Sequence, residues 1–309
     1  MARTLLLTGG SGMVGRNIQD HPMAAGWRIV APGRAELDLF DRRAVADFIA
    51  RQGADVVVHA AGEVGGIRAN MAAPVEFLDH NITLGQNVIM GARAAGVRHL
   101  LNLGSTCMYP RAAPNPLTED MILTGALEPT NEGYAIAKIF ALRLCEYIRR
   151  EDPSFHYKTL IPCNLYGPYD KFDLHAAHLV PAIIHKVHEA RQSGAPTVEI
   201  WGDGTARREF LYAADLAEAV LRAADGVESL PDLMNIGIGT DHSINDYYHA
   251  VARVIGWQGS FTHDLTKPVG MARKLSDTTR QTAWGWAPTT TLETGIAATY
   301  RFFQETLQP

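Results

Sequence analysis

The chain has 309 residues, of which 47% are hydrophobic and 20% are charged, and its formal net charge at pH 7 is −5. This composition is typical of globular proteins and excludes wholesale disorder, and the small acidic excess argues against nucleic acid as a partner. No apolar run approaches the roughly 20 residues that a membrane-spanning helix needs, so we expect no membrane partner.

The cysteines and the first residues indicate the compartment. Cys107, Cys145 and Cys163 show neither paired nor metal-like spacing, which suits a reducing compartment and predicts no bound metal. The first four residues lead into only three leucines, so we expect no signal peptide. The sequence therefore predicts a cytoplasmic protein, and its length predicts about two domains.

The first half of the chain alternates short apolar runs with segments of helical periodicity. The runs predict buried strands at residues 5–7, 28–30, 56–58, 100–103 and 159–161. The periodic segments predict helices at residues 43–52, 81–95 and 134–149. This alternation is typical of an α/β protein with a Rossmann-like, doubly wound parallel sheet.

The pattern changes after Tyr166-Gly167-Pro168, where shorter elements begin. Residues 198–201 predict a strand of a smaller unit, and residues 215–224 predict a helix that returns to the first sheet. We therefore expect a cofactor-binding domain of residues 1–165 and 206–235. A smaller α/β substrate-binding domain would comprise residues 166–205 and 236–309, with the ligands at the carboxyl ends of the strands.

A glycine-rich turn joins the first strand to the first helix, in the order Gly9, Gly10, Ser11, Gly12, Met13, Val14 and Gly15. Glycines here allow a tight turn and a close approach of the backbone to a pyrophosphate, which would meet the N-terminus of the helix. The same spacing also occurs in turns that bind nothing. The turn therefore predicts a dinucleotide site only together with the rest of the sequence.

The residues after the second strand bear on the choice of cofactor. Arg34 stands where an NAD-preferring site would carry an acid, and an arginine there can bind a 2′-phosphate, which favours NADP(H). We assign Asp38 and Leu39 to the adenine end of the same site. The alternative for Arg34 is an ordinary solvated surface residue.

Two segments contain residues that indicate a catalytic site. Tyr134 and Lys138 lie one helical turn apart on the same face, and Ser105 follows the predicted strand 100–103. A nearby cation is expected to lower the pKa of Tyr134, which could then donate a proton to a carbonyl oxygen that Ser105 also binds. A Tyr–Lys pair alone occurs by chance in many helices. The pair therefore indicates a catalytic site only together with Ser105 and the glycine turn.

Taken together, these motifs resemble the extended short-chain dehydrogenase/reductases that act on nucleotide sugars. The resemblance covers nearly the whole chain and is most specific at residues 64–70, 104–110, 127–132, 164–168 and 208–211. Within that family these segments are most similar to the GDP-4-keto-6-deoxy-D-mannose 3,5-epimerase/4-reductases, which use NADPH to make GDP-L-fucose.

The resemblance implies a role for each matching residue. Ser105, Tyr134 and Lys138 match the reductase triad, and Cys107 and His178 match the base and the acid of the epimerisation. The further cofactor-binding positions, beside Lys138 and the glycine turn, are Pro162, Asn164, Leu165 and His178. The positions implied for the GDP-sugar substrate are Lys186, Trp201, Arg208 and Lys267. The alternatives are a buried apolar cysteine, a structural histidine and solvated or core residues.

Two departures from the family leave the exact sugar open. Gly133 is smaller than the usual residue and is expected to leave room beside the sugar, and Val269 replaces a usual aspartate. Enzymes that make GDP-L-colitose or reduce a GDP-6-deoxy-heptose therefore remain alternatives. A regulatory protein that binds the cofactor without turnover is a further alternative. The resemblance also implies a homodimer paired through the helices after residues 81 and 134.

Overall fold

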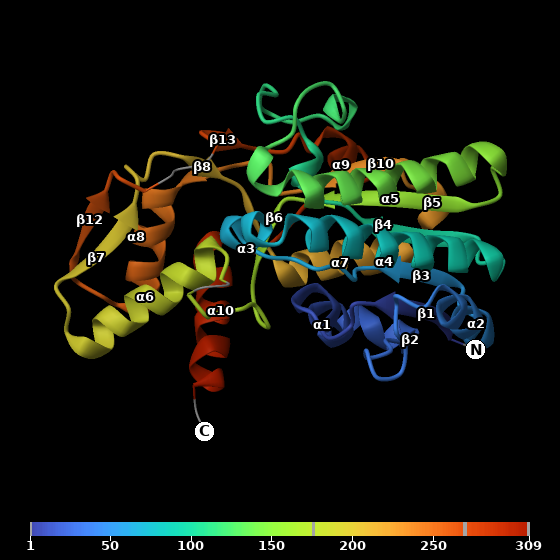
Figure 1. The fold of residues 1–309 in the computed structure, drawn as a ribbon. Coiled ribbons are helices and arrows are strands. Elements are labelled where there is room, and N and C mark those ends of the chain that lie inside the picture. The colour runs from blue at the N-terminus through green and yellow to red at the C-terminus, as the bar shows by residue number, and fades with distance from the viewer. Residues whose placement is uncertain (1, 175–176, 268–270, 308–309) are drawn as a thin grey trace.

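The computed structural model describes residues 2–174, 177–267 and 271–307. Its centre is a six-stranded sheet in the order β10-β5-β4-β3-β1-β2, in which every neighbouring pair is parallel (Figure 1). The strands are β1 (Arg3–Thr8), β2 (Trp27–Val30), β3 (Val56–His59), β4 (His99–Leu103), β5 (His156–Pro162) and β10 (Leu233–Ile236). The predicted doubly wound parallel sheet is confirmed.

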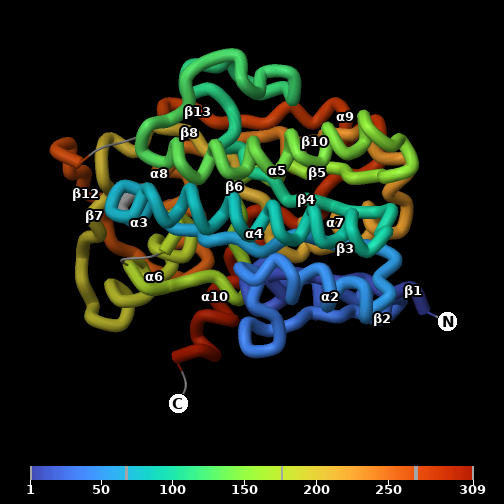
Figure 2. The backbone as a smooth tube through the Cα atoms, turned by 45° about the vertical axis from the view of Figure 1, so that its right-hand side comes forward, coloured from blue at the N-terminus to red at the C-terminus, as the bar shows by residue number. Residues whose placement is uncertain are grey.

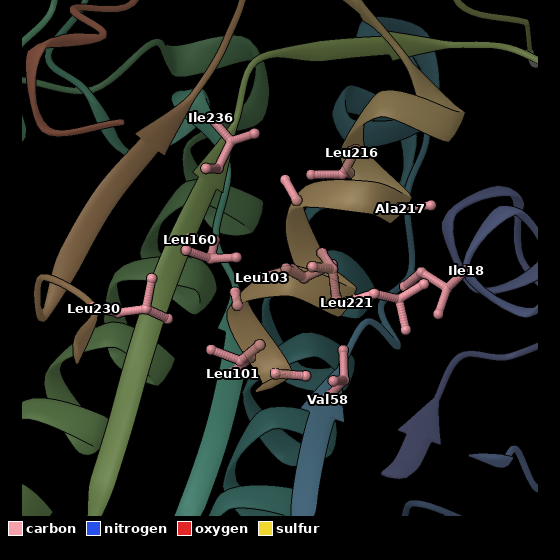
Figure 3. Close-up of a cluster of buried hydrophobic side chains, with 14 of the residues drawn as sticks. Ile18, Val58, Leu101, Leu103, Leu160, Leu216, Ala217, Leu221, Leu230 and Ile236 are labelled. Atoms are coloured by element: carbon pink, nitrogen blue, oxygen red, sulfur yellow. The ribbon is translucent and has the colours of Figure 1, made fainter. Parts of the chain in front are cut away.

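Helices cover both faces of this sheet because its strands are apolar on both sides. Successive side chains of a strand point to opposite faces, so Leu5 and Leu7 belong to one buried cluster and Leu6 to another. One face packs against α1 (Met13–Asp20) and α7 (Ala213–Asp225). Figure 3 shows Leu216, Ala217 and Leu221 of α7 beside strand residues of this cluster. The other face packs against α2 (Arg42–Gln52), α4 (Pro74–Ala94) and α5 (Glu132–Glu151).

The predicted elements occur, but one helix begins earlier than expected. The helix predicted at 81–95 starts at Pro74, seven residues upstream. Proline suits the first helical position, because its missing N–H would have no partner there and its φ is already helical. Proline in a sequence pattern can also mark a break, so the sequence did not indicate the first two turns of this helix.

A second group of elements surrounds a separate apolar cluster at the left of Figure 1. Its main elements are α6 (Leu179–Ser193), β7 (Thr197–Trp201), α8 (Ile244–Ile255), β12 (Ser260–Asp264) and α10 (Leu292–Thr306). The strand expected at 198–201 is β7, which pairs with β12. Small sheets join the two groups: β6 (Asn164–Tyr166) with β9 (Phe210–Tyr212), and β8 (Arg207–Arg208) between β11 (His242–Ser243) and β13 (Arg273–Lys274).

Short helical segments complete the connections. They are η1 (Pro22–Gly26), α3 (Ile67–Ala72), η2 (Thr106–Met108), η3 (Glu119–Met121), η4 (Pro129–Asn131), η5 (Val227–Ser229) and α9 (Thr279–Ala283). Figure 2 shows α3 at the end of the central sheet that is nearest to the second group of elements. Among the described residues, no helix has the length and apolarity required to cross a membrane.

His59, at the end of β3, gives the fold a specific sensitivity to acid. Its ring Nδ1 lies 2.9 Å from the Thr8 hydroxyl, and burial, followed by the charge of Lys138, lowers the pKa of His59 from 6.5 to about 3. Between these pH values the unfolded chain binds more protons than the folded protein, so the free energy of unfolding falls as the pH drops below 6.5.

We expect His59→Asn to reduce this loss of stability by about 1.4 kcal/mol per pH unit below pH 6.5. Urea unfolding of both proteins between pH 7 and about pH 4.5 measures the difference in slope. The exposed His249, changed to Asn, is the matched control. Equal pH slopes for the two variants would contradict the assignment.

Candidate active site

A cavity of about 1690 Å³ opens at the carboxyl ends of the central strands and extends into the second group of elements. The predicted residues that line it are Gly9, Ser11, Gly12, Met13, Val14, Gly15, Ser105, Cys107, Tyr134, Lys138, Pro162, Asn164, Leu165, His178, Lys186, Trp201 and Arg208. The predicted residues outside this lining are Gly10, Arg34, Asp38, Leu39 and Lys267. The fold thus brings the expected reductase and epimerase positions, and all the expected sugar-binding positions except Lys267, around one space.

The glycine turn forms a tightly packed cradle in which Gly9 and Gly15 have no space for a Cβ. Gly9 has φ +77°, and a Cβ there would lie 2.7 Å from the backbone of Ala60 and Ala61. A Cβ on Gly15 would lie 2.3 Å from the Gly9 carbonyl oxygen. These approaches let α1 begin directly beside the turn, and its first residues, Met13, Val14 and Gly15, line the cavity. The free N–H groups of a helix start suit a bound pyrophosphate. Gly10 instead packs against Ala31, where a Cβ would lie 2.7 Å from the alanine side chain.

The positions expected at the adenine end lie beyond this cradle. Arg34 is exposed in the turn after β2. Asp38 is also exposed, and its carboxylate accepts a hydrogen bond of 2.9 Å from the Phe40 backbone. Leu39 packs against the cluster under α2 and α4, and its carbonyl accepts a 2.9 Å bond from Asn87. Cofactor contacts of these three residues stay predictions.

Ser105, Tyr134 and Lys138 converge because β4 ends where α5 passes over it. The Ser105 hydroxyl accepts a 3.2 Å hydrogen bond from the Cys107 backbone N–H and also bonds Tyr134. The Lys138 ammonium donates a 2.9 Å bond to the Leu103 carbonyl and lies 5.7 Å from the centroid of the Tyr134 ring. The hydroxyls of Ser105 and Tyr134 thus lie together, and the buried ammonium of Lys138 lies near them.

The expectation that the pKa of Tyr134 is lowered is wrong. Burial raises the pKa of Tyr134, negative charge at Cys107 raises it further, and the bond with Ser105 lowers it only in part. Burial also lowers the pKa of Lys138 to about 8, against the opposing effect of the Cys107 charge. Loss of hydration is therefore the main influence on the pKa of Tyr134, which remains a protonated phenol at neutral pH.

Two residues that we did not single out from the sequence contact the Cys107 sulfur. The Asn131 amide nitrogen lies 3.1 Å from Sγ, and the Lys274 ammonium lies 3.8 Å from it. Asn131 falls in the segment 127–132 that resembles the family, so a signal for it existed. Lys274 is 167 residues from Cys107 in the sequence, and only the folded chain brings it to the sulfur.

His178 lines the cavity at the start of α6. Burial, followed by the nearby charge of Lys171, lowers the pKa of His178. A lowered pKa makes the imidazolium a stronger acid and the neutral ring the resting form at neutral pH. Both forms suit a group that exchanges a proton during a reaction.

Cations lie near the aromatic ring of Trp201, which lines the cavity together with Lys186 and Arg208, whereas Lys267 lies outside the lining. Trp201 is 40% exposed. The Lys186 and Lys267 ammonium groups lie 5.4 and 5.7 Å from the centroid of its ring. Burial lowers the pKa of Arg208 from its usual value. An aromatic surface beside several cations suits a base linked to a diphosphate.

The two departures from the family have different outcomes. A Cβ on Gly133 would lie 3.0 Å from the Pro74 carbonyl oxygen and 3.4 Å from the Leu78 side chain. Gly133 therefore serves the contact between α5 and α4, and the expectation that it leaves room beside the sugar is wrong. Val269 lies outside the described residues.

Comparisons with known proteins agree with this geometry. Residues 5–237 match the model of the NAD dependent epimerase/dehydratase family. The chain is 52% identical to a "GDP-L-fucose synthase" of Azorhizobium caulinodans, over 97% of this chain and 96% of the relative. It is 48% identical to a "GDP-L-colitose synthase" of Yersinia pseudotuberculosis, over 97% of each chain.

A solved structure of a GDP-mannoheptose C4 reductase from Campylobacter jejuni with NADP bound superposes with a TM-score of 0.89. It is 27% identical and is matched over 98% of this chain and 99% of its own. The glycine cradle, the Ser–Tyr–Lys arrangement and these similarities lead to one conclusion: the chain belongs to the NAD dependent epimerase/dehydratase family.

Proposed function

We propose that this protein is an NADPH-dependent 3,5-epimerase and 4-reductase that converts GDP-4-keto-6-deoxy-D-mannose to GDP-L-fucose. The observation that carries the proposal is the Cys107 sulfur beside Ser105, Tyr134 and Lys138 in a single cavity. A simple ketoreductase needs only the last three residues. The similarity to the Azorhizobium relative over nearly the full length supports the same conclusion.

The epimerisation follows from the chemistry of the substrate. Carbons 3 and 5 flank the ketone at carbon 4, so their hydrogens are acidic. The Cys107 thiolate takes the proton, the C–H electron pair passes into an enolate, and an S–H bond forms. Hydrogen bonds from Ser105 and Tyr134 stabilise the enolate oxygen, and His178, in its imidazolium form, returns a proton to the opposite face of the carbon and becomes neutral.

The reduction uses the same oxygen-binding groups. The glycine cradle around Gly9 and Gly15 fits a dinucleotide, and NADPH supplies the hydride for carbon 4 when it is bound. Tyr134 donates its proton to the oxygen at carbon 4, which is a stronger base than a phenolate once it becomes an alkoxide. The high pKa of Tyr134 therefore keeps the proton in place until the transfer. Lys138 stabilises the resulting phenolate through its charge.

A second candidate is the reaction that yields GDP-L-colitose, which the similarity to the Yersinia relative favours. That substrate lacks the hydroxyl at carbon 3 and needs inversion at carbon 5 only. Incubation with NADPH and each 4-keto sugar in turn, with product identification by NMR, separates the two. We expect kcat/KM to be at least tenfold higher for GDP-4-keto-6-deoxy-D-mannose. A reversed preference would assign the colitose reaction, and no turnover of either sugar would favour a non-catalytic protein.

Arg34→Ala tests the assignment of the cofactor. Loss of a charge-assisted bond to the 2′-phosphate should raise KM for NADPH by about tenfold and leave KM for NADH nearly unchanged. Arg43→Ala, on the exposed surface of α2, is the matched control. Parallel changes for both cofactors would remove Arg34 from the 2′-phosphate site.

We also propose that the protein is a cytoplasmic homodimer that pairs through α4 and α5. Apolar side chains on these helices support the pairing: Val75 is 75% exposed, Ile136 41% and Tyr147 53%. The three free cysteines support a reducing compartment. Light scattering should give twice the 33.7 kDa of one chain, and a monomeric mass would contradict the dimer.

A further inference from the structure

The Cys107 sulfur is fixed in the cavity wall by its own backbone. Cys107 is the second residue of η2, and the preceding Ser105 caps this turn by accepting the Cys107 N–H at 3.2 Å. The Met108 N–H bonds the Ser105 carbonyl at 3.0 Å, which closes the turn. Rotation about the Cys107 side chain alone therefore decides where the sulfur points.

Two donors from separate parts of the chain meet at this sulfur. Asn131 precedes α5 and places its amide nitrogen 3.1 Å from Sγ, and Lys274 in β13 places its ammonium 3.8 Å from Sγ. Within the described part of the chain, no carboxylate lies within 4.0 Å of the Lys274 ammonium. The sulfur is thus the polar partner toward which this cation is directed.

The position of Lys274 is built into the fold. The next residue, Leu275, donates a 2.7 Å bond to the Asn115 side chain and accepts a 2.8 Å bond from the Leu117 backbone. These bonds tie β13 to the loop that follows Cys107. On the other side, Lys274 pairs with Arg208 of β8. Movement of Lys274 away from the sulfur would have to break these contacts.

The orientation of the Asn131 amide also favours a negatively charged sulfur. Its donor nitrogen faces Sγ, whereas its carbonyl oxygen is buried without a partner among the described residues. A neutral thiol is a weak acceptor and compensates little for an unpaired buried oxygen. A thiolate is a strong, charged acceptor, and hydrogen bonds to ionised groups are about twice as strong as neutral ones.

Among the described residues, Tyr134 and Lys138 of α5 are titratable groups that interact with the charge of Cys107. Negative charge at Cys107 raises the pKa of each of them, so the three side chains are electrostatically coupled. The Lys138 ammonium donates its hydrogen bond to the Leu103 carbonyl, and Tyr134 is a neutral phenol at neutral pH. Lys274 is therefore the cation in direct contact with the sulfur, and Asn131 is the neutral donor in contact with it.

We propose that Asn131 and Lys274 are positioning residues that hold the Cys107 sulfur as a thiolate and orient it in the cavity. The inference rests on the proposed function, in which this thiolate takes the proton from carbons 3 and 5. When the S–H bond forms, the negative charge moves from sulfur to the enolate oxygen. The two donors thus determine how readily the thiolate accepts a proton and how readily the thiol loses it again.

The test is the rate of alkylation of Cys107 by iodoacetamide as a function of pH, followed by mass spectrometry of the peptide that contains it. Thiolates react and thiols do not, and Cys145 and Cys163 are buried, so Cys107 should react selectively. Lys274→Met should slow alkylation at pH 7 by about tenfold, through an upward shift of the pH midpoint by about one unit. Asn131→Asp should shift the midpoint in the same direction, because it sets a like charge beside the sulfur.

Two further variants are controls. Lys274→Arg keeps the charge and should restore a pH profile close to that of the unmodified protein. Arg43→Met removes an exposed cation on α2, away from the cavity, and should leave the alkylation profile unchanged. Binding of NADPH, measured by fluorescence, verifies that each variant is folded. If Lys274→Met does not fold, the Asn131→Asp profile decides.

An unchanged pH profile in Lys274→Met and Asn131→Asp would overturn the inference. Deuterium exchange of the keto sugar, measured on the unmodified protein in parallel, separates this failure from failure of the proposed function. If exchange is absent while the profile still responds to Lys274, the proposed function fails and the thiolate-holding role stands.

Discussion

Tyr134→Phe is expected to lower kcat for reduction by about 10²- to 10⁴-fold, the usual contribution of a positioned general acid. The substitution removes the phenolic proton that is to be transferred to the oxygen at carbon 4. It leaves the ring between Ser105 and Lys138 in place, so NADPH binding should be nearly unchanged. The measurements are NADPH oxidation with the keto sugar and fluorescence titration of NADPH.

The matched control is Tyr147→Phe, an exposed tyrosine of the same helix, which should reduce the sugar at the unmodified rate. Deuterium exchange at carbons 3 and 5 should persist in Tyr134→Phe, at a lower rate, because Ser105 still binds the enolate oxygen. A full reduction rate in Tyr134→Phe would remove this residue from the acid role.

Cys107→Ser is expected to abolish exchange at both sugar carbons, with a loss of at least 10²-fold. A serine hydroxyl ionises far less readily than a thiol, so it cannot take a carbon-bound proton near neutral pH. Proton NMR of the keto sugar in deuterated water, without NADPH, measures the exchange directly. Cys145→Ser, in the buried cluster under α4 and α5, is a control for the loss of a thiol elsewhere.

Reduction provides the second readout for Cys107→Ser. Tyr134, Lys138 and the glycine cradle are unchanged in this variant, so we expect it to reduce the unepimerised ketone slowly. Exchange at the unmodified rate would exclude Cys107 as the base. Loss of exchange together with loss of NADPH binding would point to damage of the fold, and Cys107→Ala then repeats the test with a smaller change.

The sheet could be predicted from the sequence because its signals are local. The apolar runs at Leu5, Val56 and Leu100 are buried on both faces, as parallel strands between helices require. The glycine turn could likewise be predicted, because Gly9 and Gly15 meet backbone atoms where no Cβ fits. The start of α4 at Pro74 could not, because proline marks a helix start and a helix break equally well in a sequence.

The sequence was sufficient to predict which residues form the candidate site, but not to predict their pKa values. Spacing alone places Tyr134 above Lys138, but the degree of burial decides the pKa of each group, and burial depends on the whole fold. Gly133 shows a second limit, because its neighbour Pro74 lies 59 positions earlier in the chain. Lys274 shows a third, since its contact with Cys107 joins residues that are 167 positions apart in the sequence. The domain boundaries and the cofactor contacts of Arg34 stay predictions.

The most direct measurement of the central claim is proton NMR of GDP-4-keto-6-deoxy-D-mannose with the unmodified protein in deuterated water, without NADPH. The account predicts protein-dependent loss of the signals at both carbon 3 and carbon 5, because one base and one acid in the cavity serve both centres. Exchange at carbon 5 alone would instead indicate the colitose-type reaction. No exchange, from protein that still binds NADPH, would contradict the account and leave a simple 4-ketoreductase.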